Sequence, residues 1–514
     1  MSDIVLVQPT YSEHKFSLDE VTPPMSLLCI SSILHDKGYK VKIINQIIDP
    51  DWKSHLRNEL DTNPICVGLT SVTGTQILYA LQAARLVKEH SRVPVVWGGL
   101  HASMVPETTL SNPYVDYVVI GEAEETFTNL VYHLEDNRIP KENLHSVWRK
   151  ENGAIIKTSS SPLPILGELP LIPFELDDAF HLRREPQITL ITSRGCPHQC
   201  SFCFEAYSSH RKWRALDAQT IIDQIQLYHD KYANKSAGKL RVNFNTESNF
   251  FVDPKRVKEL LKLLIKHDIP VSWDGISCRA DYLKRIDDDT LSMLHELGCK
   301  RLLFGIESGS PKMLERMNKG ITREDVFNSA DKLIKHNITF HASFIFGLPH
   351  EDWTDRNLTM DLIDKLIHRY NDKLSFLLFH YVPYPGTEAY TESLKLGLDE
   401  PKTLEAWSKY EPRNLTNLPW YSEKDFIKAD RISNVVILAG VYRQPGLAGF
   451  VQKIFRNWAR IRFIKRWFRF FPEPAIYGFF NDGYHLITQG RLRQYHQYYK
   501  ERLIYKIILK LKKL

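Results

Sequence analysis

Short apolar runs alternate with longer amphipathic segments along residues 1–130. The apolar runs have the length of strands, and the segments between them repeat their apolar residues every three to four positions, as helices do. Strands that alternate with helices form a parallel sheet, so the pattern predicts a doubly wound, Rossmann-like α/β domain. The expected strands are residues 4–8, 41–45, 65–69, 93–97 and 117–120, and residues 27–37 and 76–90 are two of the expected helices.

The alternation resumes after a proline-rich stretch without periodicity, residues 159–178, which reads as a linker. Six more strand–helix units follow, and a region without recognisable chemical motifs comes last. We therefore expect an N-terminal domain at 1–145, a linker at 146–186, a second α/β domain at 187–390 and a mainly helical region at 391–514. The strands of the second domain are expected at residues 188–192, 241–245, 272–276, 301–305, 340–345 and 376–381.

Glycines and hydroxyl side chains gather where three strands of the N-terminal domain end. Ligands of doubly wound sheets bind at the carboxyl ends of the strands. Glycine there lets the backbone approach a large ligand, and hydroxyl groups can bond its polar parts. Each stretch alone is weak evidence, because Gly-Gly after a strand is often only a turn. The residues are Thr70, Ser71 and Thr73 after the third strand, Gly98, Gly99 and His101 after the fourth, and Gly121 and Glu122 after the fifth.

The composition is that of a globular protein with more than one core. The chain has 514 residues, of which 43% are hydrophobic and 25% charged. It opens on an apparent strand rather than a signal peptide, and no apolar run is long enough for a membrane-spanning helix. Seven cysteines in this length do not make a disulfide framework. We expect a cytoplasmic, reducing location and interpret Cys29, Cys66, Cys278 and Cys299 as core residues.

Three cysteines stand at C-x3-C-x2-C spacing just after the first strand of the second domain. Three thiolates on one tight loop can ligate three irons of a [4Fe–4S] cluster and leave the fourth iron open to a small molecule. The alternative is a structural zinc site, which normally takes four ligands in paired spacings. No fourth cysteine or histidine stands at such a spacing, and we interpret His198 as a polar loop residue. The proposed ligands are Cys196, Cys200 and Cys203.

The cysteine motif and its flanks, residues 192–204, resemble the radical S-adenosylmethionine (SAM) superfamily. The resemblance implies that the open iron chelates SAM, which is cleaved to a 5′-deoxyadenosyl radical. It also implies a partial (β/α)6 barrel of the TIM type, with its chemistry at the carboxyl ends of the strands.

Polar residues at the later strand ends fit the same resemblance. Each of them alone could equally cap a helix or lie on the surface, but they occur in chain order, each at an expected strand end. The resemblance implies SAM contacts from Glu247 to the amino group, Ser277 and Arg279 to the ribose or carboxylate, Glu307 and Ser308 in Gly-Ile-Glu-Ser, and Gly347 near the adenine.

The glycine-rich strand ends of the first domain, together with Pro23-Pro-Met-Ser-Leu, resemble the cobalamin-binding domain attached to many radical SAM enzymes. The Asp-x-His-x-x-Gly motif of other cobalamin proteins is absent. The resemblance therefore implies a cobalamin held base-off, without a histidine from that motif below the cobalt. His101 is a candidate for contacting the corrin or a plain loop histidine. The alternative for the whole domain is a flavodoxin-like module without its ligand.

Both domains together resemble the cobalamin-dependent radical SAM enzymes, a group with methyltransferases and the anaerobic magnesium-protoporphyrin monomethyl ester cyclase. The resemblance implies an enzyme that uses a [4Fe–4S] cluster, SAM and cobalamin, and that methylates an unactivated carbon of a small-molecule substrate. It also implies an electron donor of the flavodoxin or ferredoxin type. The alternatives are a cobalamin-linked oxidation or cyclisation without methyl transfer, and a non-catalytic cobalamin or redox sensor.

The basic charge of the chain belongs to its C-terminal part. Residues 441–514 carry 16 Lys and Arg against 3 Asp and Glu, a net +13, whereas the whole chain carries +6 and residues 1–440 therefore −7. Aromatic and basic residues interleave at 452–472, and aliphatic and basic ones at 499–514. Such helices fit peripheral contact with a membrane and hence a lipophilic substrate. The alternatives are an amphipathic helix packed on the barrel and, with no recognisable binding module to support it, a nucleic-acid partner.

Overall fold

The computed structural model describes residues 2–12, 16, 18, 21–183, 187–205, 211–232, 240–244, 247, 249–273, 275–411, 415, 418–440 and 446–468. The chain forms two compact units. The first comprises Met1–Ser277, Ile286–Cys299 and Val382–Leu415, and the second comprises Cys278–Arg285, Lys300–Tyr381 and Thr416–Leu514. A segment that follows the last expected strand thus returns to the unit that contains the N-terminal domain.

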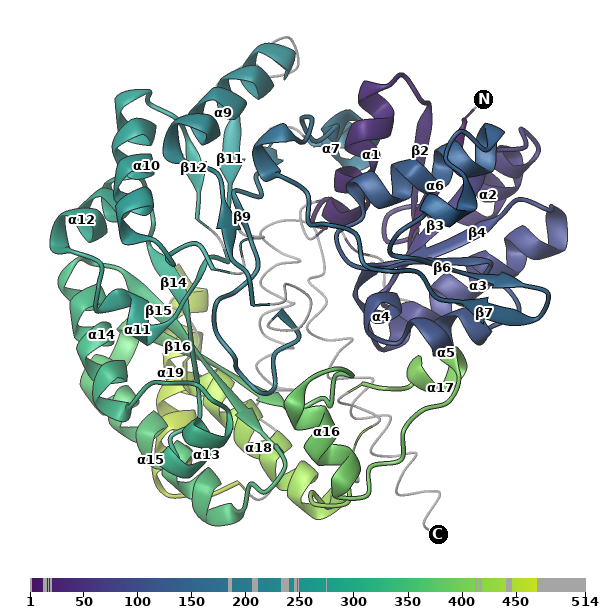
Figure 1. Cartoon of the computed structure of the whole chain (residues 1–514). Helices are drawn as coiled ribbons and strands as arrows, with labels where there is room; N and C mark the ends of the chain where they lie inside the picture. Colours follow the sequence, from purple (N-terminus) through teal and green to yellow (C-terminus); the bar gives the residue numbers. More distant parts are fainter. Residues whose placement is uncertain are drawn as a thin grey trace. The chain divides into compact units, whose positions relative to one another are not determined.

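The N-terminal domain is built on a sheet of order β2-β1-β3-β4-β5-β6-β7, which confirms the expected doubly wound fold (Figure 1). The strands β1 to β5 pair in parallel, and their side chains are buried on both faces because helices cover both. The strand order reverses between β1 and β3, which is where sheets of this class bind ligands. The five strands are β1 (Ile4–Gln8), β2 (Val41–Asn45), β3 (Cys66–Thr70), β4 (Val95–Gly98) and β5 (Tyr117–Val119).

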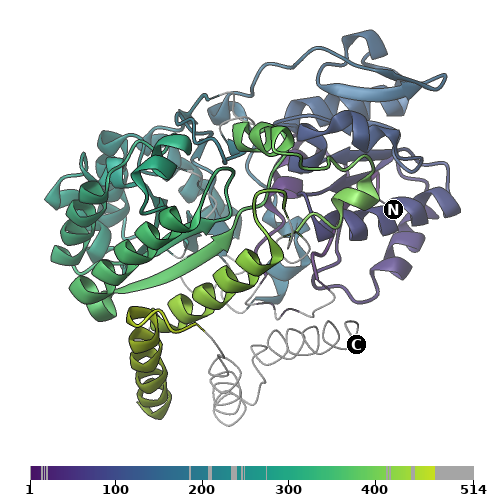
Figure 2. The ribbon, with the colours of Figure 1, turned by 90° about the horizontal axis from the view of Figure 1, so that it is seen from below.

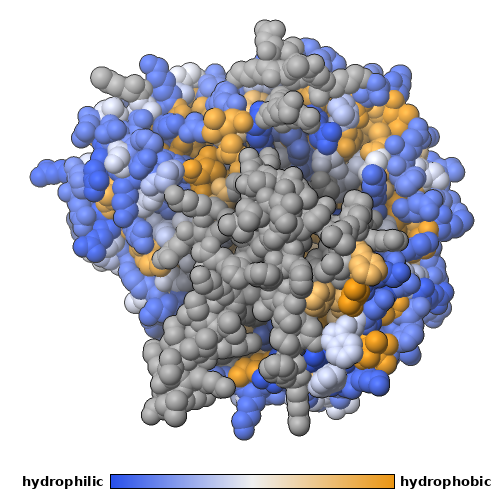
Figure 3. Space-filling model, turned by 180° about the vertical axis from the view of Figure 1, so that it is seen from behind, coloured by the Kyte–Doolittle hydropathy of each residue, from blue (hydrophilic) through white to orange (hydrophobic). Residues whose placement is uncertain are grey.

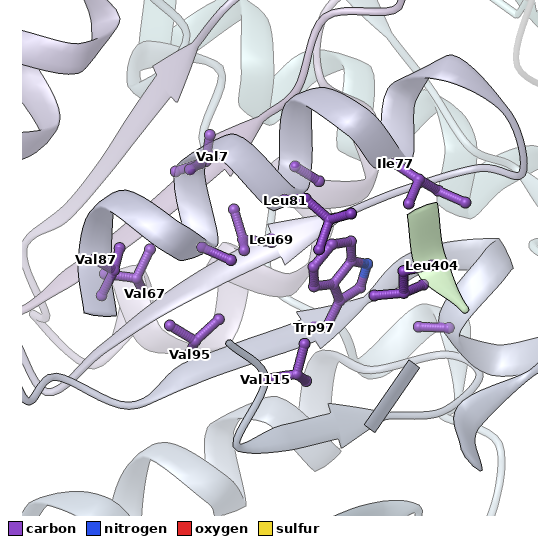
Figure 4. Packing of buried hydrophobic residues seen from close by; sticks show 14 of the residues in the cluster. Val7, Val67, Leu69, Ile77, Leu81, Val87, Val95, Trp97, Val115 and Leu404 are labelled. Atoms are coloured by element: carbon purple, nitrogen blue, oxygen red, sulfur yellow. The ribbon is translucent and has the colours of Figure 1, made fainter. Parts of the chain in front are cut away.

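The helices of this domain form one layer on each side of the sheet. Helices α1 and α6 pack together, and so do α2 and α3. Figure 4 shows the core beneath α3, where Trp97 of β4 is fully buried and Leu404 of α17 (Leu404–Trp407) packs beside it. The returning segment therefore completes an N-terminal core. The other helices are α1 (Met25–Asp36), α2 (Trp52–Leu60), α3 (Thr75–His90), α4 (Gly99–Met104), α5 (Pro106–Ser111) and α6 (Glu124–Asp136).

Two antiparallel strands extend this sheet beyond the expected start of the linker. Strands β6 (Val147–Glu151) and β7 (Ala154–Ile156) form a hairpin that pairs with β5. Their turn contains Asn152 at φ 49° and Gly153 at φ 81°. Two consecutive residues with positive φ, in an Asn-Gly pair, are typical of a tight two-residue hairpin turn.

The rest of the first unit contains a parallel sheet of order β12-β11-β8 and a short hairpin. Helices α9 and α10 pack together, and α12 packs on α10. In the hairpin, Arg194 of β9 lies opposite Arg214 of β10. The elements are α7 (Asp178–Leu182), β8 (Gln187–Thr189), β9 (Ser193–Arg194), β10 (Arg214–Ala215), α9 (Ala218–Tyr232), β11 (Arg241–Asn243), α10 (Pro254–Lys266), β12 (Val271–Ser272), α12 (Asp288–Glu296) and α16 (Glu388–Lys395).

The second unit is built on the sheet β13-β14-β15-β16. Helices α14 and α15 each begin with a capping box, at Thr322 with Asp325 and at Asp352 with Asp355, which satisfies free backbone donors. All six strands expected for the second domain are therefore present, in agreement with the predicted barrel class. The elements are β13 (Ser277–Cys278), α11 (Ala280–Leu283), β14 (Arg301–Glu307), α13 (Pro311–Arg316), α14 (Arg323–Lys335), β15 (Thr339–Phe346), α15 (Trp353–Tyr370) and β16 (Leu374–His380).

Two long helices follow in the same unit, as expected for a mainly helical C-terminal region. Helix α18 (Glu423–Ala439) lies along β16, and α19 (Gly446–Ile464) packs on α18 (Figure 2). The predicted basic and aliphatic stretch at 499–514 lies outside the described residues. Across the part of the chain that is described, no helix combines the length and the apolar character needed to cross a bilayer. Most described side chains on the face in Figure 3 are hydrophilic, with hydrophobic ones in separate groups.

Gly99 is needed where β3 and β4 end side by side. Its φ is +85°, and a Cβ added there would lie 2.5 Å from the Thr70 hydroxyl oxygen and 2.8 Å from the Ser71 nitrogen. Gly153 has a similar φ of +81°, but no atom of the part of the chain that is described lies within 4 Å of a Cβ added there. A side chain at Gly153 would therefore add backbone strain alone, whereas a side chain at Gly99 would add both backbone strain and steric overlap.

We expect Gly153→Ala to cost about 1 kcal/mol, from the left-handed backbone alone. Gly99→Ala should cost about 2–4 kcal/mol, because overlap with β3 adds to the same strain. Thermal unfolding of the two variants checks this. Equal losses of stability would mean that the β3–β4 contact at Gly99 is not tight.

Candidate cofactor-binding site

The three cysteines lie together on one loop that begins at the end of β9. Cys196 and Cys200 are buried and Cys203 is half-buried. The Cys203 nitrogen donates to the Cys200 carbonyl oxygen at 3.1 Å, which closes the loop tightly. Burial raises the pKa of the Cys203 thiol to about 11, and the other two cysteines add to this effect.

The donor set of this loop consists of three free thiols. Each thiolate of a cubane cluster binds a different iron. The three thiols therefore fit a [4Fe–4S] cluster whose fourth iron is not bound by a cysteine of this loop.

Thr192 and Ser193, which lead into this loop, are held by a buried carboxylate. Both oxygens of Glu247 are engaged: one accepts from the backbone nitrogens of Thr192 and Ser193, the latter at 3.0 Å, and the other from the Ser193 hydroxyl. Arg256 donates to the carbonyl and hydroxyl oxygens of Thr192 at 3.0 and 2.6 Å. Burial raises the pKa of Glu247, while these donors and Arg256 oppose the rise. Glu247 thus supports the arm that carries the first cysteine, residues 192–195, which we call the cluster arm.

Arg194 ties the cluster arm to the N-terminal sheet. Its guanidinium donates to Glu122 at 2.8 Å and to Glu124 at 2.5 Å. Glu122 also accepts from Arg214 of β10, which in turn donates to the Pro164 carbonyl oxygen at 2.6 Å. Glu122, which was predicted to bind a cofactor, is therefore bonded through both carboxylate oxygens to arginines of the hairpin β9–β10, which we call the cluster hairpin.

The predicted ligand residues of the N-terminal domain do lie together at the ends of β3, β4 and β5. Thr70 and Ser71 are buried, and the Ser71 hydroxyl accepts from the Trp97 indole nitrogen at 2.8 Å. Among the described residues, an added Cβ would meet no atom within 4 Å at Gly121, and at Gly98 only the Val119 carbonyl oxygen at 3.8 Å. The space beside these two glycines is therefore open, as close approach of a ligand requires.

His101 is fully buried behind these strand ends. Its backbone nitrogen donates to the Ser71 carbonyl oxygen at 3.0 Å, and its Nδ1 lies 3.0 Å from the Thr73 hydroxyl. The ring packs edge-on against Trp407 at 5.4 Å between centroids, and Nε2 has no hydrogen-bond partner within the described parts of the chain. Burial lowers the pKa of His101 to about 3, so the ring is neutral at physiological pH.

The second unit gathers further predicted residues at the end of β14. Glu307 has φ +70°, where the pairing with β15 is irregular, and its carboxylate accepts from Lys319 at 2.9 Å in a buried pair. Arg279 donates to the Lys319 carbonyl oxygen and to Asp281. A non-glycine residue with positive φ is strained, and such strain is typical of functional sites.

Two of the remaining predicted residues, Ser308 and Gly347, have local partners. The Ser308 hydroxyl is buried, accepts from the Ser310 nitrogen at 3.1 Å and lies 3.2 Å from the Thr359 hydroxyl. Ser277 is half-buried at the start of β13. Gly347, with φ +92°, donates to Glu351 and accepts from the Trp420 indole at 2.9 Å.

The loop after β15 is fixed by a buried ion pair. Arg356 donates to Glu351 at 2.9 Å, and its guanidinium stacks over the Tyr421 ring. Burial raises the pKa of Glu351 to about 7, although Arg356 and the Gly347 nitrogen oppose the rise. A Cβ at Gly347 would lie 3.0 Å from the Tyr421 ring, so only glycine keeps this backbone in place.

Sequence reasoning missed the basic partners of these carboxylates. Arg194 stands directly before Gly195 and Cys196, and this position was a signal that could have identified it. Lys319 and Arg256 lie in ordinary helical or loop sequence, where nothing local distinguishes them. Their roles depend on which distant carboxylates they meet.

Comparison with known proteins supports both domain assignments. The chain matches the radical SAM superfamily over residues 190–363 and the B12 binding domain over residues 16–131. An uncharacterized methyltransferase of Pyrococcus horikoshii is 28% identical over 394 residues, which cover 75% of this chain and 82% of the relative. A bacteriochlorophyllide d C-8(2)-methyltransferase of Chlorobaculum tepidum is 29% identical, covering 71% and 75%. The anaerobic magnesium-protoporphyrin IX monomethyl ester cyclase of Rubrivivax gelatinosus is 23% identical, covering 76% and 69%.

Two solved structures share the fold. The radical S-adenosylmethionine methyltransferase TsrM from Kitasatospora setae, solved with cobalamin and a [4Fe-4S] cluster, superposes with a TM-score of 0.61 at 18% identity, covering 82% of this chain and 83% of that one. The cobalamin-dependent radical enzyme OxsB, solved with aqua-cobalamin and S-adenosylmethionine, gives 0.65 at 15% identity, covering 99% and 80%.

We expect the buried state of His101 to make the protein sensitive to acid. In the unfolded chain a histidine titrates near pH 6.5, whereas the folded pKa of His101 is about 3. Between these values the unfolded chain binds a proton that the folded one does not. The free energy of unfolding should therefore fall by up to about 1.4 kcal/mol per pH unit below about pH 6.5.

Thermal unfolding of wild type, His101→Asn and a control, His145→Asn, between pH 8 and pH 5 checks this. His145 is exposed, so the control should keep the wild-type pH dependence. The dependence should be weaker in His101→Asn, and an unchanged slope in that variant would contradict the buried neutral state.

Proposed function

The chain belongs to the cobalamin-binding radical SAM enzymes, and from this premise we propose that it transfers a methyl group to an unactivated carbon of a small-molecule substrate. The family uses a [4Fe–4S] cluster, SAM and cobalamin. The methyltransferases among the relatives, at 28% and 29% identity, support methyl transfer. The observation that carries the proposal is the attachment of the cysteine loop to the cobalamin-type domain through Arg194, Glu122 and Glu124, because methyl transfer requires both cofactors in one catalytic unit.

When bound, the cofactors supply the electron that cleaves SAM and the methyl group that is transferred. The residues of the chain hold and orient them. Cys196, Cys200 and Cys203 would supply the thiolates, and burial keeps water away from Cys196 and Cys200. Reduction of the cluster also requires a one-electron donor. We propose that this donor is a protein of the flavodoxin or ferredoxin type.

We propose that cobalamin lies against the open glycines Gly98 and Gly121 and the Thr70 hydroxyl. Both glycines leave room where a Cβ would stand. Ser71 and His101 already bond within the domain, so we propose that they shape this surface from behind.

For SAM we propose Ser277, Arg279, Glu307 and Gly347. The buried Lys319 holds Glu307, and Trp420 and Glu351 hold the Gly347 loop. A ligand that meets groups already held in place loses less conformational freedom on binding.

A second candidate function is oxidation or cyclisation without methyl transfer. It is favoured by similarity to the anaerobic cyclases, at 23% identity for that of Rubrivivax gelatinosus and 25% for that of Synechocystis. The two functions differ in the fate of SAM, because only methyl transfer produces S-adenosylhomocysteine.

We expect protein reconstituted without oxygen, with iron, sulfide, hydroxocobalamin and a strong reductant, to convert SAM to 5′-deoxyadenosine and S-adenosylhomocysteine. Cys200→Ala should lose both products because it removes a cluster ligand. Cys299→Ala, at a buried core cysteine, should retain them. Mass spectrometry of the products measures both.

Continued SAM cleavage by Cys200→Ala would overturn the cluster assignment. Deoxyadenosine without S-adenosylhomocysteine, when candidate substrates are present, would favour the second function. Neither product, in a protein that also fails to bind cobalamin, would exclude both.

We also propose that α19 contacts a membrane peripherally, on the cytoplasmic side. Its exposed side chains include an apolar stripe beside the exposed Lys453 and Asn457. In this stripe Phe450, Ile454, Trp458 and Ile461 recur every three to four residues and are 63%, 54%, 39% and 46% exposed. The arginines of this helix are bonded within the protein, with Arg456 paired to Asp372 and Arg460 donating to the Ala439 carbonyl oxygen. A helix that merely packs on the domain should instead expose its basic face. A lipophilic substrate would suit an enzyme at this location.

We expect the full chain to sediment with anionic vesicles and Phe450→Gln/Trp458→Gln to sediment several-fold less, because the apolar face loses its inserting side chains. Leu227→Gln, at an exposed apolar residue of α9, is the matched control and should bind like wild type. Equal sedimentation of all three proteins would remove the membrane proposal.

A further inference from the structure

We propose that Glu122 and Glu124 are positioning residues of the cluster arm, which they couple to the N-terminal sheet, and that neither contacts the corrinoid. This inference rests on the proposed function, since it concerns the cluster that the cysteine loop would hold. It replaces a direct cofactor role for Glu122 with an action through two arginines.

Glu122 joins both strands of the cluster hairpin. It follows Gly121, whose φ of +79° turns the chain away from β5. One carboxylate oxygen accepts from Arg194 of β9 at 2.8 Å and the other from Arg214 of β10. Because Arg194 and Arg214 are partners across the hairpin, one carboxylate fixes both strands.

Glu124 provides the second anchor from the first turn of α6. Its side chain is 3% exposed, and one oxygen accepts from Arg194 at 2.5 Å. The other oxygen has no hydrogen-bond partner within the described residues. Glu124 also lines a cavity with Cys29, Leu190 and Tyr228. Two carboxylates thus balance two guanidinium groups, and loss of either carboxylate leaves an uncompensated positive charge in a largely buried place.

The arm has little freedom to absorb a shift of Arg194. Thr192 and Ser193 are bonded to Glu247 and Arg256. After Arg194 only Gly195 precedes the first thiol. Movement of the guanidinium should therefore displace Cys196, and with it the cluster.

The charge of Glu122 should also affect the reduction potential of the cluster, in a direction that can be predicted. Reduction makes the cluster more negative, so extra positive charge nearby stabilises the reduced form and raises the reduction potential. Replacing Glu122 with neutral Gln leaves Arg194 and Arg214 undercompensated. If Glu122 had only a structural role, the reduction potential of the cluster would not change with the net charge of Glu122, Arg194 and Arg214.

The test compares Glu122→Gln, Glu124→Gln and Glu125→Gln in the reconstituted full chain. Glu125 is the exposed neighbour on α6 and serves as the matched control. Redox titration followed by electron paramagnetic resonance measures the cluster potential, and the visible spectrum measures the Kd for hydroxocobalamin. We expect Glu122→Gln and Glu124→Gln to raise the reduction potential of the cluster and to slow SAM cleavage at least tenfold. Their Kd for hydroxocobalamin should stay within twofold of wild type. Glu125→Gln should behave like wild type in all three measurements.

The charge-balanced variant Glu122→Gln/Arg214→Gln completes the test. Its potential should return toward the wild-type value, because one negative and one positive group are removed together. If Glu122→Gln does not fold, this variant alone decides: an unchanged Kd for hydroxocobalamin is expected, and a tenfold weaker one overturns the proposal.

Three results of the single variants would overturn the inference: weaker corrinoid binding with an unchanged potential, changes in both, or a change in neither. Wild-type protein that forms no cluster would instead refute the proposed function. The two failures are therefore distinguishable.

Discussion

A buried guanidinium is the constraint on which the first unit depends. Arg194 is largely withdrawn from water, and a charge in such a place is tolerated only when opposite charges bond it. Its partners come from the end of β5 and the start of α6, about seventy residues earlier in the chain. The N-terminal sheet and the cysteine loop therefore cannot move apart without exposing or unpairing this charge.

The second unit relies on a similar arrangement with different residues. Glu307 keeps a left-handed backbone, which is costly, and Lys319 bonds its carboxylate in a buried pair. Gly305 makes this possible, because a Cβ there would lie 2.5 Å from the Glu307 carboxylate. In both units, buried acid–base pairs hold strand ends in conformations that the local chain would not adopt alone.

Local sequence patterns predicted the strands and helices well where every residue of the element is buried, because burial then requires an apolar side chain at each position. Residues 4–8 and 41–45 form strands with the expected bounds, because a strand covered on both faces must be apolar throughout. The hairpin of β6 and β7 was missed although Asn152-Gly153 is a strong turn signal. The return of α17 to the N-terminal core had no such signal, since nothing around Leu404 says which hydrophobic surface it will meet.

The sequence by itself determined the chemistry the protein can perform. The spacing of Cys196, Cys200 and Cys203 defines a three-thiolate loop, and strand ends rich in glycine define places for large ligands. These are short-range properties, readable from neighbouring residues. Only the tertiary structure decided the partners of the charged groups: Glu122 and Glu247 look alike as predicted ligands, yet both support the cluster arm. Ion pairs and hydrogen bonds form between groups that are close in space, and local sequence does not record which distant segments folding will bring together.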